Sequence, residues 1–191
     1  MTMQPLLIDL EERLDTERLI LRCVKPGDGP KINEALCDSL HALRQFPASL
    51  PWALEEPSLE RSEIYCREGF ANFIARRDFR FLILLRDTEM LAGCCGLHQP
   101  NWSVPSIEIG WWGNTRHQGH GYISEAVAAL VQFAFARLGM RRVSAFVDDL
   151  NLKSARVCER AGLTLEGVLR NERADPDGTL RNTRVYAAIS G

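Results

Sequence analysis

A short run with two glycines constrains this chain more than any other feature. The run is Arg116-His117-Gln118-Gly119-His120-Gly121-Tyr122, and it lies between a strand-like segment and a strongly helical one. Because glycine has no Cβ, the backbone at Gly119 and Gly121 can bend through positive φ and bring its N–H groups against a ligand. The helix that follows aims its positive end at the same point. The run therefore predicts a cradle for a pyrophosphate group.

Two common nucleotide-binding loops do not fit this run. A dinucleotide fingerprint needs a third glycine at position 124, which is Ser124 here. A P-loop needs a Gly-Lys-Ser/Thr sequence, and none follows. The spacing Arg-x-x-Gly-x-Gly therefore indicates a cradle of another class.

The rest of the chain interleaves strand-like and helical segments. The β-rich runs predict strands at 19–24, 79–86, 90–98, 106–112, 142–147, 163–166 and 184–189. Helical spacing predicts helices from about residue 30, at 59–76, at 123–138 and at 153–161, with a loop over 41–57. The long helix after the glycines implies a parallel crossover, and the short connections imply antiparallel pairs. The predicted fold class is mixed α and β.

Further segments accompany the glycine run in a fixed order. They are Thr16–Arg22, Leu50–Trp52, Glu108–Trp112, Phe133–Gly139, Asn151-x-x-Ser154 and Ala161–Gly167. With the spacing Arg-x-x-Gly-x-Gly they resemble the GNAT superfamily of N-acetyltransferases, most closely its ribosomal-protein N-terminal (RimJ/RimL-like) branch. The resemblance covers nearly the whole chain.

The resemblance implies a fold and an activity. The fold would be the GNAT fold, a central twisted and mostly antiparallel sheet with helices on both faces and a splayed parallel pair of strands at the acetyl-CoA site. Residues 1–191 would form one domain. The activity would be transfer of an acetyl group from acetyl-CoA to a primary amine, most simply the α-amino group of a protein N-terminus.

The expected acetyl-CoA site comprises the glycine run and its surroundings. By resemblance, pantetheine docks where two strands splay apart, with its thioester held by main-chain groups near Trp111. Gly110, in the middle of a strand, suggests a bulge at this point. The full set is Ile109, Gly110, Trp111, Trp112, Arg116, His117, Gln118, Gly119, His120, Gly121, Tyr122, Ser124, Asn151 and Ser154.

Two residues are candidates for the acid–base chemistry. Strand alternation makes Glu108 face opposite to Ile107 and Ile109, and so toward a cleft if the isoleucines face the core. Family members carry a general base on this strand, and a free glutamate at the rim is the alternative. Ser154 resembles the residue placed near the leaving sulfur, where its hydroxyl would hydrogen-bond the developing thiolate. No tyrosine of this chain matches the tyrosine that many GNAT enzymes use there.

The acceptor site is less defined by the sequence. Trp52 could hold a cationic amine on its aromatic face, or could simply pack in the core. Glu172 is a candidate substrate-side acid by resemblance, but a register shifted by one would put Arg173 there and imply a different acceptor. An α-amino group with pKa ~8 needs a weaker base than a lysine with pKa ~10.4, which favours a terminal amine. The alternatives are a small amine (an antibiotic, polyamine or amino acid) and a non-catalytic acyl-CoA sensor.

Composition argues against several other classes. The formal net charge is −2, so there is no broad basic face for nucleic acid. No apolar run reaches a membrane span and no signal peptide is recognisable, so a cytoplasmic protein is expected. The 6 cysteines show no Cys-x-x-Cys spacing, and adjacent Cys94 and Cys95 would point to opposite faces of a strand, so neither disulfides nor a metal site is expected. A homodimer could cover apolar surface near Trp111 and Trp112.

Overall fold

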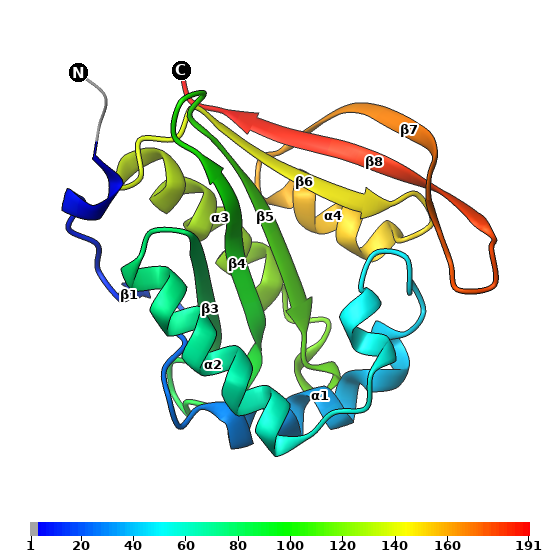
Figure 1. The fold of residues 1–191 in the computed structure, drawn as a ribbon, viewed down its shortest axis with the longest axis horizontal. Helices are drawn as coiled ribbons and strands as arrows, with labels where there is room; N and C mark the ends of the chain where they lie inside the picture. The colour runs from blue at the N-terminus through cyan, green and yellow to red at the C-terminus, as the bar shows by residue number, and fades with distance from the viewer. Residues whose placement is uncertain (1–3) are drawn as a thin grey trace.

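Eight strands form one sheet in the computed structural model, which describes residues 4–191 (Figure 1). The order across the sheet is β1-β2-β3-β4-β5-β6-β8-β7, and only β5 and β6 pair in parallel. The strands are β1 (Arg13–Asp15), β2 (Leu19–Cys23), β3 (Asp78–Leu85), β4 (Leu91–Asn101), β5 (Ser106–Gly113), β6 (Arg142–Asp148), β7 (Thr164–Ala174) and β8 (Leu180–Ile189). The mixed α and β class, mostly antiparallel with one parallel pair, is confirmed.

Four α-helices cover the two faces of the sheet (Figure 1). The first pair, α1 (Gly29–Leu43) and α2 (Leu59–Ile74), packs on one face. The second pair, α3 (Tyr122–Ala136) and α4 (Leu152–Arg160), packs on the other. Short 3₁₀ turns are η1 (Pro5–Leu7), η2 (Pro51–Leu54) and η3 (Thr115–His117). Within residues 4–191, no helix has the length and apolar character that crossing a bilayer requires.

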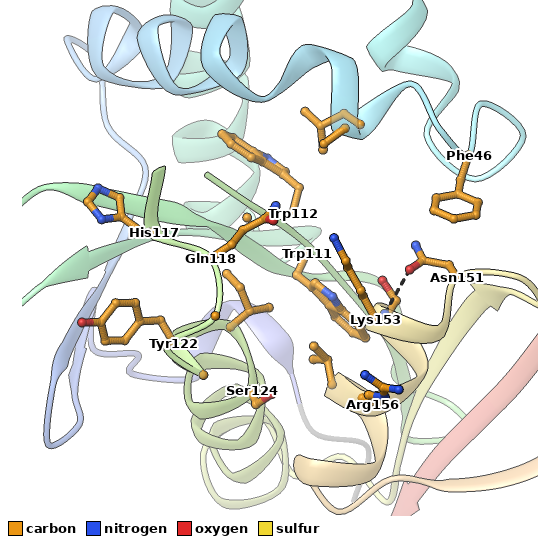
Figure 2. Close-up of a pocket in the computed structure, with 18 of the residues that line it drawn as sticks. Phe46, Trp111, Trp112, His117, Gln118, Tyr122, Ser124, Asn151, Lys153 and Arg156 are labelled. Carbon is orange, nitrogen blue, oxygen red and sulfur yellow. Dashed lines mark hydrogen bonds between the residues drawn. The ribbon is translucent and has the colours of Figure 1, made fainter. Parts of the chain in front are cut away.

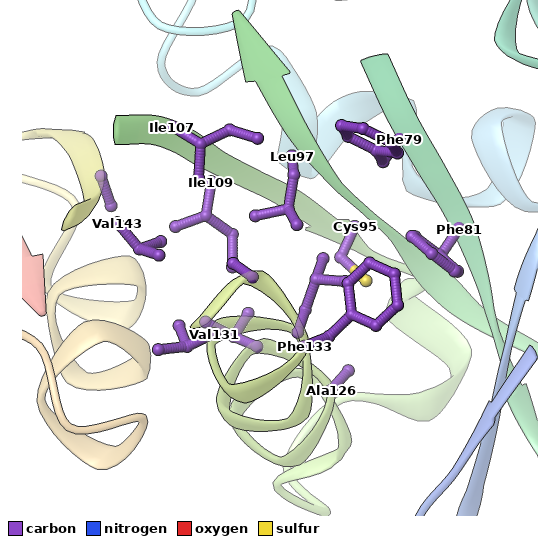
Figure 3. Close-up of a cluster of buried hydrophobic side chains, with 14 of the residues drawn as sticks. Phe79, Phe81, Cys95, Leu97, Ile107, Ile109, Ala126, Val131, Phe133 and Val143 are labelled. Atoms are coloured by element: carbon purple, nitrogen blue, oxygen red, sulfur yellow. The ribbon is translucent and has the colours of Figure 1, made fainter. Parts of the chain in front are cut away.

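The core on the α3 face shows why the glycine run is held rigidly. The apolar residues at helical spacing in and just after α3 are buried at Val127, Leu130, Val131, Ala134 and Leu138, and Ile123 in the first turn is half-buried. They pack against the inward residues of β4 and β5, such as Leu97, Ile107 and Ile109 (Figure 3). Burying one such side chain is worth about 1.5–3 kcal/mol. The N-terminus of α3, where the glycines end, is therefore fixed to the sheet by packing along the whole helix.

The closing hairpin differs from the sequence expectation. The strands predicted at 163–166 and 184–189 are much longer, as β7 and β8, and are joined by a turn at Pro176 and Asp177. Nearly every residue of β7 is exposed, so the strand lacks the buried alternation that would reveal it in the sequence. The short edge strand β1 was not predicted either.

The parallel pair opens after three residues. β5 pairs with β6 only from Ser106 to Glu108, although both strands continue to Gly113 and Asp148. Backbone groups of residues 109–113 on that side therefore have no strand partner. The bulge expected at Gly110 is wrong, because Gly110 stays in register with Gly96 of β4. The close neighbour at Gly110 is instead a side chain, with His98 Nε2 3.4 Å from where a Cβ would stand.

Candidate active site

Two cavities meet where β5 and β6 separate. The larger has a volume of about 660 Å³ and extends along the glycine run and α4 (Figure 2). The smaller has a volume of about 180 Å³ and lies between β5, β6 and β7. Their linings share Phe46, Leu50, Trp111, Asn151 and Ser154. A group that crosses from one cavity to the other must pass these five residues.

The glycine run has the form expected of an anion cradle. Gly119 and Gly121 have φ of +85° and +78°, the left-handed region that glycine adopts without cost. Gly121 is the N-cap of α3. Within residues 4–191, no hydrogen bond has a backbone donor in 119–124. These N–H groups can therefore serve a ligand, and the helix dipole favours a negative one.

Cationic side chains of α4 lie across from the cradle. Lys153, Arg156 and Arg160 line the larger cavity, and none makes a salt bridge within the described chain. Figure 2 shows Lys153 and Arg156 beside Trp111. The sequence reasoning missed them, although a spacing of three and four residues on a helix would have placed them on one face. Amides on one wall and cations on another suit a pyrophosphate-bearing ligand such as coenzyme A.

Most loop residues expected in the cofactor site line the larger cavity. They are His117, Gln118, Gly119, Gly121, Tyr122 and Ser124, with Trp111 and Trp112 from β5. His120 does not line it, because its ring stacks on Tyr122 with ring centroids 5.4 Å apart. Ile109 and Gly110 line the smaller cavity instead.

Arg116 is also outside the cavity linings. Its Nη2 donates to Asp38 Oδ1 of α1 at 2.8 Å, and its Nη1 lies 3.4 Å from Glu34 Oε1. The guanidinium that was expected to pair with a phosphate is therefore paired in this structure with the two carboxylates of α1. Arg116 connects the start of the loop to α1.

Glu125 ties the end of the loop to the β1–β2 turn. Its carboxylate accepts hydrogen bonds from the Thr16 hydroxyl at 2.6 Å and from Arg18 Nε at 2.7 Å. Burial alone would raise the pKa of Glu125, but these hydrogen bonds outweigh it and lower the pKa. Arg18 also donates to the carbonyl of His120 at 3.0 Å. The loop is thus held from both ends by ion pairs with distant segments.

Asn151 and Ser154 stand at the junction of the cavities. Asn151 is the N-cap of α4, and its Oδ1 accepts the backbone N–H of Ser154 at 3.0 Å (Figure 2). Asparagine is among the residues preferred at this position of a helix. The cap also fixes where the first turn of α4 presents the Ser154 side chain.

Glu108 lines the smaller cavity and not the larger one. Ile107 and Ile109 are each 2% exposed, so alternation turns Glu108 to the opposite face, as expected. Its carboxylate accepts no hydrogen bond within residues 4–191. The cross-strand neighbour is His98, whose Nδ1 lies 2.7 Å from Asp78 Oδ1. An unpaired carboxylate beside the cavity junction can accept a proton from a bound amine.

The expected acceptor residues are arranged differently from the sequence prediction. Trp52 lines neither cavity; it is 44% exposed and tilts against Trp112 at 6.5 Å, because Pro51 starts a 3₁₀ turn there. The Glu172 carboxylate is outside both linings and accepts a hydrogen bond from the Thr183 hydroxyl at 2.7 Å. Arg173 lines the smaller cavity in its place. Of the two residues that the alternative registers would place at the acceptor, Arg173 is therefore the one that lines a cavity.

Comparisons with known proteins agree with this architecture. The chain is 30% identical to the N-acetyltransferase YoaA of Bacillus subtilis (strain 168) over 177 residues, which cover 92% of this chain and 96% of that protein. It is 28% identical to the ribosomal-protein-serine acetyltransferase of Escherichia coli (strain K12) over 160 residues, 81% of this chain and 84% of that protein. The solved structure of RimL, a ribosomal L7/L12 α-N-protein acetyltransferase in complex with coenzyme A, superposes with a TM-score of 0.82 at 22% identity, covering 93% of this chain and 98% of that one.

The family follows from the sequence profile of one domain. The profile of the acetyltransferase (GNAT) domain matches residues 18–164, which include the glycine run, β5 and the residues at the cavity junction. The relatives also agree with the resemblance to the RimJ/RimL-like branch. The chain therefore belongs to the GNAT family of N-acetyltransferases, which take their acetyl group from acetyl-CoA.

Proposed function

We propose that this enzyme acetylates the α-amino group of a protein N-terminus, with acetyl-CoA in the larger cavity and the amine in the smaller one. The observation that carries the proposal is the junction of the two cavities at Trp111, Asn151 and Ser154, with Glu108 on the smaller side only. A donor and an acceptor bound on either side would meet there, which makes the reaction effectively unimolecular.

The larger cavity would hold the donor through two kinds of contact. The backbone N–H groups of residues 119–124 bind the pyrophosphate, and Lys153, Arg156 and Arg160 supply positive charge opposite them. When bound, acetyl-CoA supplies a thioester whose carbonyl carbon is the electrophile. Backbone groups of residues 109–113, which have no partner on β6, are suited to hold the thioester and its developing oxyanion.

Proton movements in this reaction are assigned to two side chains. Glu108 takes the proton of the attacking amine through a water molecule, as the new C–N bond forms. Ser154 donates a hydrogen bond to the thiolate as the C–S bond breaks. A serine hydroxyl is too weakly acidic to give up its proton here, while a thiol with pKa near ~8.5 leaves readily.

The choice of a terminal amine is supported by the pKa of such amines and by the similarity of the chain to a ribosomal-protein acetyltransferase. An α-amino group with pKa ~8 is partly neutral at pH 7 and needs only a modest base such as one carboxylate, whereas a lysine with pKa ~10.4 needs more help. The Escherichia coli relative is named for acetylating a serine of a ribosomal protein. A cavity of about 180 Å³ is smaller than the ~300–1,000 Å³ of typical ligand sites, so it suits the end of a longer acceptor.

The first test is release of the coenzyme A thiol from acetyl-CoA. The purified protein is offered N-terminal peptides, polyamines, aminoglycosides and free amino acids in separate reactions. Turnover of peptides supports the proposal, and turnover confined to small amines contradicts its acceptor class. A raised melting temperature with acetyl-CoA but no turnover of any amine would favour a sensor.

The role of Glu108 has its own test. Glu108→Gln should lower kcat by about 10²–10⁴-fold and leave the Kd for acetyl-CoA unchanged, because the residue lines only the smaller cavity. Glu68→Gln, which removes an exposed carboxylate on α2, is the matched control and should change neither. An unchanged kcat in Glu108→Gln would show that another group is the base.

A further inference from the structure

A guanidinium faces the smaller cavity with most of its donors unused. Arg173 Nε donates to Glu172 Oε2 at 3.0 Å, and within residues 4–191 neither Nη of Arg173 makes a hydrogen bond or salt bridge. Glu172 is itself held by the Thr183 hydroxyl at 2.7 Å. The contact through Nε therefore fixes the side chain while its two Nη atoms remain available. Such a pair of atoms matches a carboxylate in bidentate geometry.

Arg173 lies at the end of an irregularity in β7. The register with β8 shifts between Leu169 and Arg173, so that four steps on β7 correspond to two on β8. Asn171, inside this bulge, has φ of +54°, and its backbone N–H donates to Asn182 Oδ1 at 3.0 Å. Bulges of this kind redirect side chains and occur beside active sites.

A second donor lines the same cavity. The Ser49 hydroxyl is buried and has no hydrogen-bond partner within the described chain. The neighbouring backbone N–H of Ala48 donates to Asp175 Oδ1 at 3.1 Å, and Asp175 follows Arg173 by two residues. This contact joins the loop that carries Ser49 to the hairpin that carries Arg173. The two unused donors are thus held on adjoining walls of one small cavity.

The charges that line the smaller cavity indicate which acceptor chemistry it can bind. Asp148 also lines it, but Arg181 pairs with both of its oxygens at 2.8 and 2.9 Å. That leaves two charged groups of the lining with free hydrogen-bonding atoms: the Glu108 carboxylate, which has no partner within residues 4–191, and the two Nη atoms of Arg173, whose pairing with Glu172 uses only Nε. An acceptor with an ammonium and a nearby anionic group would match both at once.

We infer that Arg173 and Ser49 form a subsite for a carboxylate that the acceptor carries next to its reactive amine. The inference rests on the proposed function, since it assumes that the amine enters the smaller cavity. The carboxylate can come from an acidic residue at the start of a peptide or from the α-carboxylate of a free amino acid.

The test compares acceptors that differ only in charge. Peptides with Asp, Asn or Lys at the first or second position are assayed beside free amino acids and their amides. The wild-type enzyme should prefer the carboxylate of each matched pair by about tenfold or more in kcat/KM, mainly through KM. Arg173→Gln should remove this preference, and Arg173→Glu should shift it toward Lys.

Arg170→Gln is the control variant. Arg170 lies on the same strand, is exposed and lines neither cavity, so this variant makes the same charge change and should keep the preference. Equal rates for Asp and Asn peptides, or a preference that persists in Arg173→Gln, would overturn the subsite and leave the proposed function standing. Turnover of free amino acids but not of their amides or of peptides would support the subsite and contradict a protein acceptor. Absence of turnover with every amine would overturn both.

Discussion

Arg116, the first residue of the glycine run, is bound by Asp38 of α1 through two contacts of 2.8 Å. The sequence suggested instead a guanidinium ready for a phosphate. In the structure this ion pair joins the loop to the opposite face of the sheet from α3. Arg116 therefore shapes the acetyl-CoA cradle from outside.

Removing either partner of this ion pair should have the same effect. Arg116→Gln and Asp38→Asn should each weaken acetyl-CoA binding by about twofold to fivefold, because an exposed ion pair contributes roughly 0.2–1 kcal/mol. The double variant should be no weaker than either single one, as expected for coupled residues. Isothermal titration calorimetry measures all three. A loss in Arg116→Gln tenfold larger than in Asp38→Asn would mean that the guanidinium touches the ligand.

Gly119→Ala should lower both stability and acetyl-CoA affinity. The φ of +85° costs an alanine about 1–2 kcal/mol, and the new Cβ would meet no protein atom within 4 Å and would stand in open space at a residue that lines the larger cavity. Gly27→Ala is the matched control, with φ of +96° and an equally open surrounding far from the cavities. The melting temperature should fall by a similar amount in both variants, and the Kd for acetyl-CoA should rise only in Gly119→Ala. Equal Kd values for acetyl-CoA in the two variants would show that Gly119 does not take part in binding it.

Asp78→Asn should destabilise the protein near neutral pH but not in acid. Burial alone would raise the pKa of Asp78, but the hydrogen bonds from His98 and Arg80 outweigh it and lower the pKa. A lowered pKa means that the carboxylate stabilises the fold above its unfolded pKa of about 3.9, and that this is lost as pH falls through the folded value.

Urea unfolding from pH 7 to pH 3 measures this dependence. The free energy of unfolding should differ between wild type and Asp78→Asn by about 1.5–3 kcal/mol at pH 7, and the difference should shrink below pH 4. Asp87→Asn, at an exposed turn, is the control and should differ little at any pH. A difference that grows in acid would contradict the assignment.

One cysteine should react with thiol reagents in the native protein. Cys37 is exposed and the other five are buried, and burial raises the pKa of Cys23, Cys66 and Cys158 to about 12. A thiol titration should find one rapid thiol in the native state and six in denaturant, and Cys37→Ser should remove the rapid one. Rapid reaction of a second thiol would contradict this burial pattern. Cys37→Ser would also lower the background when coenzyme A release is measured with a thiol reagent.

Local sequence was enough to predict the cradle and the facing of Glu108. The glycines, the following apolar stripe of α3 and the strand alternation around Glu108 all depend on neighbours in the chain, and backbone geometry transmits them directly. The order of strands around the crossover also followed from connection lengths.

Contacts between distant segments decided the rest. Arg116 pairs with Asp38, 78 positions away in the chain, and the N–H of Ala48 donates to Asp175, 127 positions away. No local sequence pattern could predict either contact. Arg173 lines the smaller cavity and Glu172 does not, on a strand whose register with β8 shifts twice, and such shifts depend on the pairing of the two strands rather than on a local pattern. The sequence by itself determined the family and the conformation of the glycine run, since these depend on short-range geometry. Only the tertiary structure decided which charges line the smaller cavity, because that depends on register and packing between elements far apart in the chain.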